Sequence, residues 1–320
     1  MDIFQQVLLL IAGLGVFLYG MKIMSDSLET IAGNQIKTLF SKITSNKIVG
    51  VGVGLTTTAI IQSSSAVTVM LIGFVNAGLM TLEQVPSIIF GANIGTTVTA
   101  ILVAVGFSGS SLNLSVLFAS LTGIGALAMM FTKKDKVKKI CSLLVGLGML
   151  FLGLEVMGES MGSVGEKYSY IFADITNPML LLLIGIIFTA VIQSSSAASG
   201  IFITMTVAGM LTLDQSLYLI IGSNIGTCVT ALIACIGGCV NAKRTAFLHL
   251  NIKVIGTIVF MLFLLIPGVE FADWMRAIAP GNVAMQVALV NTTTNIWCSS
   301  KYLSGKLLNS SNDIHKILLL

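Results

Sequence analysis

Two stretches of the sequence place four consecutive polar side chains inside apolar segments. The first is Gln-Ser-Ser-Ser at residues 62–65, within IIQSSSAVTVM, and the second is the same quartet at residues 193–196, within VIQSSSAASGI. Hydroxyl and amide groups can hold an ion through donated hydrogen bonds or through oxygen ligands. In apolar surroundings these groups are costly unless they have partners. Because the interruption occurs twice in matching surroundings, it indicates a functional site rather than an accident of packing.

The two quartets belong to an internal repeat. Residues 54–100 align with residues 185–231 at a constant offset of 131, and 24 of the 47 aligned positions are identical. Both aligned blocks end in a second shared motif, GANIGTTVTA in the first and GSNIGTCVTA in the second. Further out, GVFLYGMKIM (15–24) resembles GMLFLGLEVM (148–157) at a slightly different offset. The chain is therefore two copies of one unit, which in a membrane protein is typical of transporter halves.

The composition indicates a membrane protein built from helices. The mean hydropathy is +0.99, and only 9% of the residues are charged, whereas a soluble protein of this size needs a far more charged surface. The apolar segments show no strict alternation of apolar and polar residues, so we expect helices rather than a β-barrel.

Basic residues predict the orientation. They gather before the first quartet, between the copies, after the second NIGT motif and near the C-terminus, and the positive-inside rule places all of these in the cytoplasm. Each quartet has about a dozen apolar residues on either side, too few for two spans and too many for one. A re-entrant hairpin with the quartet at its tip removes the difficulty. The basic residues concerned are Lys37, Lys42, Lys47, the 133–139 run, Lys243, Arg244, Lys301, Lys306 and Lys316.

Each copy then has three full spans, so the two copies must be inverted. The expected fold class is an all-α polytopic membrane protein with two inverted-topology repeats, each with a re-entrant helical hairpin and a broken transmembrane helix. We place it in the cell membrane as a multi-pass protein, with the N-terminus outside and the C-terminus cytoplasmic. The expected parts are a first repeat (1–132; hairpin about 48–80, broken helix about 82–105), a basic linker (133–139), a second repeat (138–267; hairpin about 178–211, broken helix about 213–236), a C-terminal membrane helix (282–303) and a cytoplasmic tail (304–320).

The hairpin tips carry the predicted chemistry. Inside a membrane, the carbonyls that end one half-helix and the amides that start the next need partners. Serine can cap the outgoing half-helix, and the amides beyond it attract an anion. The carbonyl end, together with side-chain oxygens, suits a small hard cation. We assign the anion to Ser63, Ser64, Ser65, Ser194, Ser195 and Ser196, and cation binding to Gln62, Gln193, Asn93, Thr96 and Asn224.

The NIGT motifs are expected to break a helix in each copy. Thr81 and Thr212 each begin such a helix as a Thr-x-x-Gln capping box, and the Asn-Ile-Gly triplets at 93–95 and 224–226 interrupt it.

The predicted site contains no Arg or Lys. Desolvating an anion without a fixed positive charge costs several kcal/mol, so an anion needs co-bound cations there. This predicts a cation-coupled symporter working by alternating access, not an enzyme, with no cofactor other than the coupling ions. Lys253 lies about two turns into a predicted span, and we expect it to snorkel towards the cytoplasm, although an intramembrane charge is a functional candidate. We expect His249 to be a hydrogen-bonded histidine of the bundle.

The doubled QSSS element, each followed about thirty residues later by GxNIGT, resembles the type II sodium-dependent phosphate cotransporters and their bacterial relatives. The resemblance implies inorganic phosphate as the substrate and sodium as the coupling ion. It places phosphate at the serines of both tips and a sodium ion at Ser223, Thr227 and Thr230. This chain departs from the family pattern on the helix after each NIGT element, where the first copy has no His and the second keeps His249 and Asn251 without the usual Phe.

Two other functions compete with this one. Hydroxyls and helix ends do not select phosphate uniquely, so the chain could carry another oxyanion or a dicarboxylate. A more distant alternative, an intramembrane serine hydrolase, needs a base near a serine. The only histidines are His249 and His315. The expected partners are phosphate, sodium and the lipid bilayer, with no nucleic acid; a homo-oligomer is compatible with the sequence.

Overall fold

The computed structural model describes residues 3–41, 46–107, 114–173 and 175–303. Within these ranges all regular structure is helical, which confirms the expected all-α class. Five helical stretches are long and apolar enough to cross a membrane: Phe4–Gly33, Val85–Gly106, Asp135–Gly162, Leu213–Ala234 and Val240–Leu264. The predicted tail, with His315, and the side chain of Lys42 lie outside the described residues. The side of the membrane on which each terminus lies stays a prediction.

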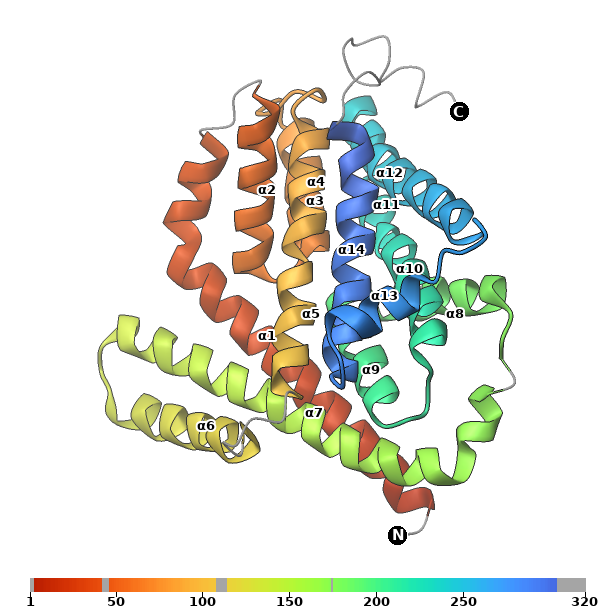
Figure 1. Cartoon of the computed structure of the whole chain (residues 1–320). Helices are drawn as coiled ribbons and strands as arrows, with labels where there is room; N and C mark the ends of the chain where they lie inside the picture. The colour runs from red at the N-terminus through yellow and green to blue at the C-terminus, as the bar shows by residue number, and fades with distance from the viewer. Residues whose placement is uncertain (1–2, 42–45, 108–113, 174, 304–320) are drawn as a thin grey trace.

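The order of the helices follows the repeat. Four helices of the first copy, α2 to α5, recur in the second copy as α8 to α11 at the same offset. In Figure 1, α2 and α3 lie in the upper part of the molecule, α8 and α9 lie lower, and α14 runs between the copies. The helices are α1 (Ile3–Ser41), α2 (Lys47–Ile61), α3 (Ser64–Asn76), α4 (Val85–Gly95), α5 (Thr97–Gly106), α6 (Leu114–Phe131), α7 (Asp135–Ala173), α8 (Pro178–Ile192), α9 (Ser195–Val207), α10 (Leu213–Gly226), α11 (Cys228–Ala234), α12 (Val240–Leu264), α13 (Phe271–Ile278) and α14 (Val283–Leu303).

The long helices α1 and α7 cross with their backbones in close contact at glycines. A Cβ atom added at Gly20 would lie 2.9 Å from the carbonyl oxygen of Gly146, and one added at Gly13 would lie 3.0 Å from that of Gly153. Small residues permit such approaches between membrane helices. In the loose repeat, Gly13 corresponds to Gly146 and Gly20 to Gly153. The two contacts are therefore reciprocal, the pattern that a two-fold axis produces between equivalent elements.

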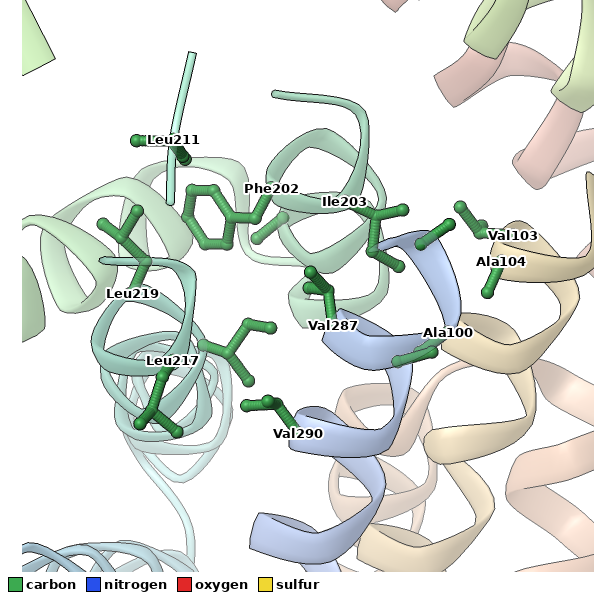
Figure 2. Packing of buried hydrophobic residues seen from close by; sticks show 14 of the residues in the cluster. Ala100, Val103, Ala104, Phe202, Ile203, Leu211, Leu217, Leu219, Val287 and Val290 are labelled. Carbon is green, nitrogen blue, oxygen red and sulfur yellow. The ribbon is translucent and has the colours of Figure 1, made fainter. Parts of the chain in front are cut away.

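A shared apolar core joins the copies. It packs α5 of the first copy against α9 and α10 of the second, and α14 contributes to it between them (Figure 2). Burial of apolar side chains from these helices, with others from α1, α7, α8, α12 and α13 in the same cluster, holds the two copies against each other. The side chains seen in Figure 2 include Ala100, Val103, Ala104, Phe202, Ile203, Leu211, Leu217, Leu219, Val287 and Val290.

Only one of the two expected capping boxes forms. Thr212 caps α10, accepting the Gln215 N–H at 3.1 Å, while the Gln215 Oε1 accepts the Thr212 N–H at 2.8 Å. In the first copy, α4 begins only at Val85, and no side chain caps it. Half of the capping box expected at Thr81 forms, since the Gln84 Oε1 accepts the Thr81 N–H at 2.9 Å, but the Thr81 hydroxyl donates to that same oxygen at 3.2 Å and does not cap the helix. Pro86 explains the difference, because proline lacks the N–H that a helix starting at residue 82 would need there.

The interruption at each NIGT motif is slighter than expected. One residue separates α4 from α5, and one separates α10 from α11: Thr96 (φ −62°, ψ −25°) and Thr227 (φ −58°, ψ −26°). These dihedral angles are helical, so each helix pair continues as one span. The glycines of the motifs serve close packing instead, since a Cβ atom at Gly95 would lie 2.7 Å from the carbonyl oxygen of Leu55 on α2.

The glycine crossing generates a prediction with a matched control. Replacing Gly20 by Leu forces a side chain into the α7 backbone, and such overpacking costs about 1–3 kcal/mol or more. Replacing Gly15 by Leu on the same helix meets no atom within 4 Å of the new Cβ. We expect a lower melting temperature and a smaller monodisperse peak in size-exclusion chromatography for Gly20→Leu only. Equal behaviour of the two variants would show that the crossing is not tightly packed.

Candidate functional site

Both serine quartets lie at the end of one helix and the start of the next. α2 ends at Ile61 and α8 at Ile192, and each is followed by a glutamine in the left-handed conformation, Gln62 and Gln193, both with φ 59°. They are the only described residues other than glycine with positive φ. This conformation costs a non-glycine residue about 1–2 kcal/mol. Glycine is the usual residue at this position, so a glutamine in both copies indicates that its side chain is needed.

The Gln62 side chain connects the first tip to α5. Its Nε2 donates to the carbonyl oxygen of Ala59 at 2.5 Å, and its Oε1 accepts the Thr99 hydroxyl at 2.7 Å. The Ser196 hydroxyl of the second tip lies 3.5 Å from the Thr99 Oγ1. Thr99 therefore brings together two quartets that are 131 residues apart in the sequence. Sequence reasoning missed Thr99, although its repeat counterpart, Thr230, was a predicted ligand.

The second copy lacks the equivalent bond. Gln193 is exposed, whereas Gln62 is half-buried. The Thr230 hydroxyl, the counterpart of Thr99, is buried without a partner. The two copies thus share a backbone conformation at the tip but differ in side-chain bonding.

The serines take two distinct positions at each tip. Ser63 and Ser194 are N-caps, and their hydroxyls accept the backbone N–H groups of Ala66 at 3.1 Å and Ala197 at 3.2 Å, as predicted. The other four lie in the first turn of α3 or α9, where backbone amides have no acceptor within the helix. Their side chains are 6–8% exposed: Ser64, Ser65, Ser195 and Ser196. Hydroxyls and free amides converging at a helix N-terminus are suited to an anion.

Buried oxygens without partners lie beside the tips. A Cβ atom at Gly95 would lie 2.7 Å from the Cβ of Thr58, and one at Gly226 would lie 2.8 Å from that of Thr189, so each NIGT motif packs against the helix that leads to its tip. A buried polar atom without a partner costs about 1–3 kcal/mol, and such a group calls for an explanation, of which a bound ion is one. The atoms concerned are the hydroxyl oxygens of Thr58, Thr189, Ser223 and Thr230, and both side-chain amide atoms of Asn93.

Two other predicted cation ligands, Thr96 and Thr227, already have partners. The hydroxyls of Thr96 and Thr227 donate to backbone carbonyls one turn earlier, Ala92 at 3.1 Å and Ser223 at 2.9 Å. A hydroxyl that donates in this way keeps its lone pairs for a cation. Thr58 and Thr189 were not among the predicted ligands, although their recurrence in the repeat marked them.

Lys253 contradicts its predicted position. Its side chain is 3% exposed, and its Nζ donates to the Oδ1 atoms of Asn224 at 3.2 Å and Asn295 at 2.9 Å. It therefore lies inside the bundle and does not snorkel, because α10 and α14 supply the acceptors there. The expectation that the site has no basic residue is wrong. The expected hydrogen bonding of His249 is also wrong at its buried Nδ1, which has no partner.

Comparison with known proteins shows to which family the chain is similar. The family model described as Na+/Pi-cotransporter matches residues 16–159 and 161–294. "Uncharacterized protein YqeW" of Bacillus subtilis is 31% identical over 253 residues, which cover 78% of this chain and 79% of the relative. No solved structure matches the chain.

Other relatives have descriptive names. "Putative inorganic phosphate export protein YjbB" of Escherichia coli is 27% identical over 257 residues, covering 79% of this chain but only 46% of that protein. "Sodium-dependent phosphate transport protein 2B" of Homo sapiens is 34% identical over 101 residues, covering 31% of this chain and 15% of that protein. These names describe transport proteins rather than enzymes. Since the family model spans most of the sequence, the chain belongs to the Na+/Pi-cotransporter family.

Proposed function

We propose that this protein is a sodium-coupled symporter that carries inorganic phosphate across the cell membrane by alternating access. The observation that carries the proposal is the meeting of the two serine tips at Thr99, beside buried oxygens that have no partner. Family membership supports both phosphate and sodium as the transported species. The chain aligns with less than half of the E. coli relative, and the proposal concerns this chain alone.

Phosphate binds, in this proposal, at the N-termini of α3 and α9. The first-turn amides and the hydroxyls of Ser64, Ser65, Ser195 and Ser196 donate to its oxygens. Ser63 and Ser194 act mainly as caps that hold those turns in place, since their hydroxyl oxygens already accept backbone N–H groups.

Sodium binds at the NIGT motifs. The unpartnered hydroxyls of Ser223 and Thr230, with the Thr227 oxygen, form the site of the second copy, and Asn93 and Thr96 contribute in the first. A bound cation would satisfy oxygens that otherwise cost free energy in the buried state. Gln62 and Gln193 set the geometry of the tips next to these sites.

The helix lengths and contacts support inverted copies with re-entrant hairpins. α2 has 15 residues and α3 has 13, so at 1.5 Å per residue each is about 20 Å long, too short for a hydrocarbon core of about 30 Å. Helices α1 and α7 run antiparallel where they cross, since Gly13 contacts Gly153 and Gly20 contacts Gly146. Corresponding helices that cross a membrane antiparallel have opposite topology.

Uptake into proteoliposomes tests the function. With an inward sodium gradient, we expect accumulation of radioactive phosphate that a potassium gradient does not support. Failure of excess sulfate or succinate to compete would separate phosphate transport from that of another oxyanion or a dicarboxylate. Since the name of the E. coli relative describes export, vesicles preloaded with phosphate test the outward direction. Folded protein without sodium-dependent phosphate flux in either direction would refute the proposal.

Serine substitutions test the anion site. Ser64→Ala and Ser195→Ala each remove one donor to a charged ligand, a loss of about 1.5–3 kcal/mol, or roughly tenfold or more in the KM for phosphate. Ser120→Ala is the control, because that hydroxyl donates only to its own helix at Val116 on α6. Wild-type KM values in both tip variants would exclude these serines from the site.

The variant Gln62→Gly separates the role of the glutamine side chain from that of the left-handed backbone conformation. Glycine adopts the left-handed conformation without penalty, so the melting temperature should stay equal or rise, while Gln62→Ala keeps the strain of about 1–2 kcal/mol. Both variants lose the bond to Thr99, and we expect reduced phosphate uptake in both. Normal uptake by Gln62→Gly would mean that the glutamine only shapes the turn.

A further inference from the structure

Lys253 has an unusual place in the bundle. Its ammonium is buried between the side-chain oxygens of Asn224 on α10 and Asn295 on α14, at 3.2 and 2.9 Å. Asn224 is 4% exposed and Asn295 is 0% exposed. Two amide oxygens that converge on one point inside a membrane protein are ligands that a small cation would also use. The ammonium therefore occupies a cation position on the second NIGT motif.

No carboxylate in the described part of the chain pairs with the Lys253 Nζ to balance a positive charge on it. Among the described residues, the salt bridges both involve Arg276 on α13, which pairs with Asp214 and Asp273. The oxygen partners of Lys253 are neutral amides. A buried charge of this kind is costly unless an opposite charge comes close, and the transported anion is such a charge.

The first copy provides an internal comparison. Asn93 is the repeat counterpart of Asn224, and both its amide atoms are buried without a partner. The constant offset places Thr122 of α6 at the position of Lys253, and its hydroxyl donates to Phe118 in its own helix. Asn224 therefore accepts a hydrogen bond from the Lys253 ammonium, whereas the side chain of its counterpart, Asn93, has no partner.

We propose that Lys253 is a tethered cation that takes the place of one coupling sodium ion, occupying the position between Asn224 and Asn295 and balancing one charge of the bound phosphate. The proposal rests on the sodium-coupled transport proposed above. It predicts that removing the ammonium opens a position for an additional sodium ion, because both amide oxygens remain.

The test is the ratio of sodium to phosphate flux in proteoliposomes, measured with ²²Na and ³²P. Lys253→Ala removes the charge and vacates the space, whereas Lys253→Arg keeps the charge. We expect Lys253→Ala to carry about one more sodium ion per phosphate than the wild type, since the bound anion then needs another cation, and to show a steeper dependence of uptake on sodium. Lys253→Arg should keep the wild-type ratio. An unchanged ratio in Lys253→Ala would overturn the proposal.

Thermal unfolding of purified protein tests sodium binding even in a variant that does not transport. A ligand that binds only the folded state raises its melting temperature. Lys253→Ala should gain more stability in sodium chloride over potassium chloride than the wild type, and Asn295→Ala added to it should remove the gain. A purely structural lysine would lower the melting temperature equally in both salts, which would also overturn the proposal. If Lys253→Ala does not fold, Lys253→Ser, which also removes the ammonium and vacates the space, takes its place in both measurements.

Failure of the two proposals can be distinguished. Without sodium-dependent phosphate flux in the wild type, the proposed function fails whatever the variants do. With that flux present and the ratio of Lys253→Ala unchanged, only the role of Lys253 fails.

Discussion

The structure depends on one constraint, the pairing of backbone groups where a helix stops inside an apolar bundle. A chain in hydrocarbon must satisfy each N–H and C=O within the protein, yet a binding site needs some of them free. At Gln62 the backbone N–H bonds the carbonyl of Thr58 at 2.7 Å, and the side chain bonds that of Ala59. Ser63 then caps the next helix. The incoming carbonyls of Thr58 and Ala59 are thus satisfied locally, and the outgoing first-turn amides are groups left for a ligand.

The features that the sequence predicted well are those set by nearby residues. The caps by Ser63 and Ser194 join atoms three residues apart, and their repetition made the pattern recognisable. The failure at Thr81 was also local, because Pro86 stands two residues after Gln84 and prevents the helix from starting earlier. At the NIGT motif, Asn and Gly suggested a break, but glycine can also allow two helices to approach, and packing against α2 decided the outcome.

The features that could not be predicted join distant parts of the chain. Thr99 bonds a residue 37 positions away, and Lys253 bonds asparagines 29 and 42 positions away. The expectation that Lys253 would reach the cytoplasm treated its surroundings as lipid, whereas α12 faces the polar side of α14. The NTTTN stretch at 291–295 was the available signal, since so polar a run within a membrane helix needs polar neighbours.

The unequal bonding of the two tips has a consequence for motion. Thr99 is bonded to Gln62, while Thr230 lacks the matching bond to Gln193. Because the copies share the same tip backbone, a rearrangement that breaks the first bond and forms the second conserves the number of hydrogen bonds. The two conformations would then differ in which copy carries the bond between the glutamine and the threonine, and they would be close in free energy. A carrier that must visit two conformations repeatedly needs such a near balance, and here duplication provides it without a separate switching element.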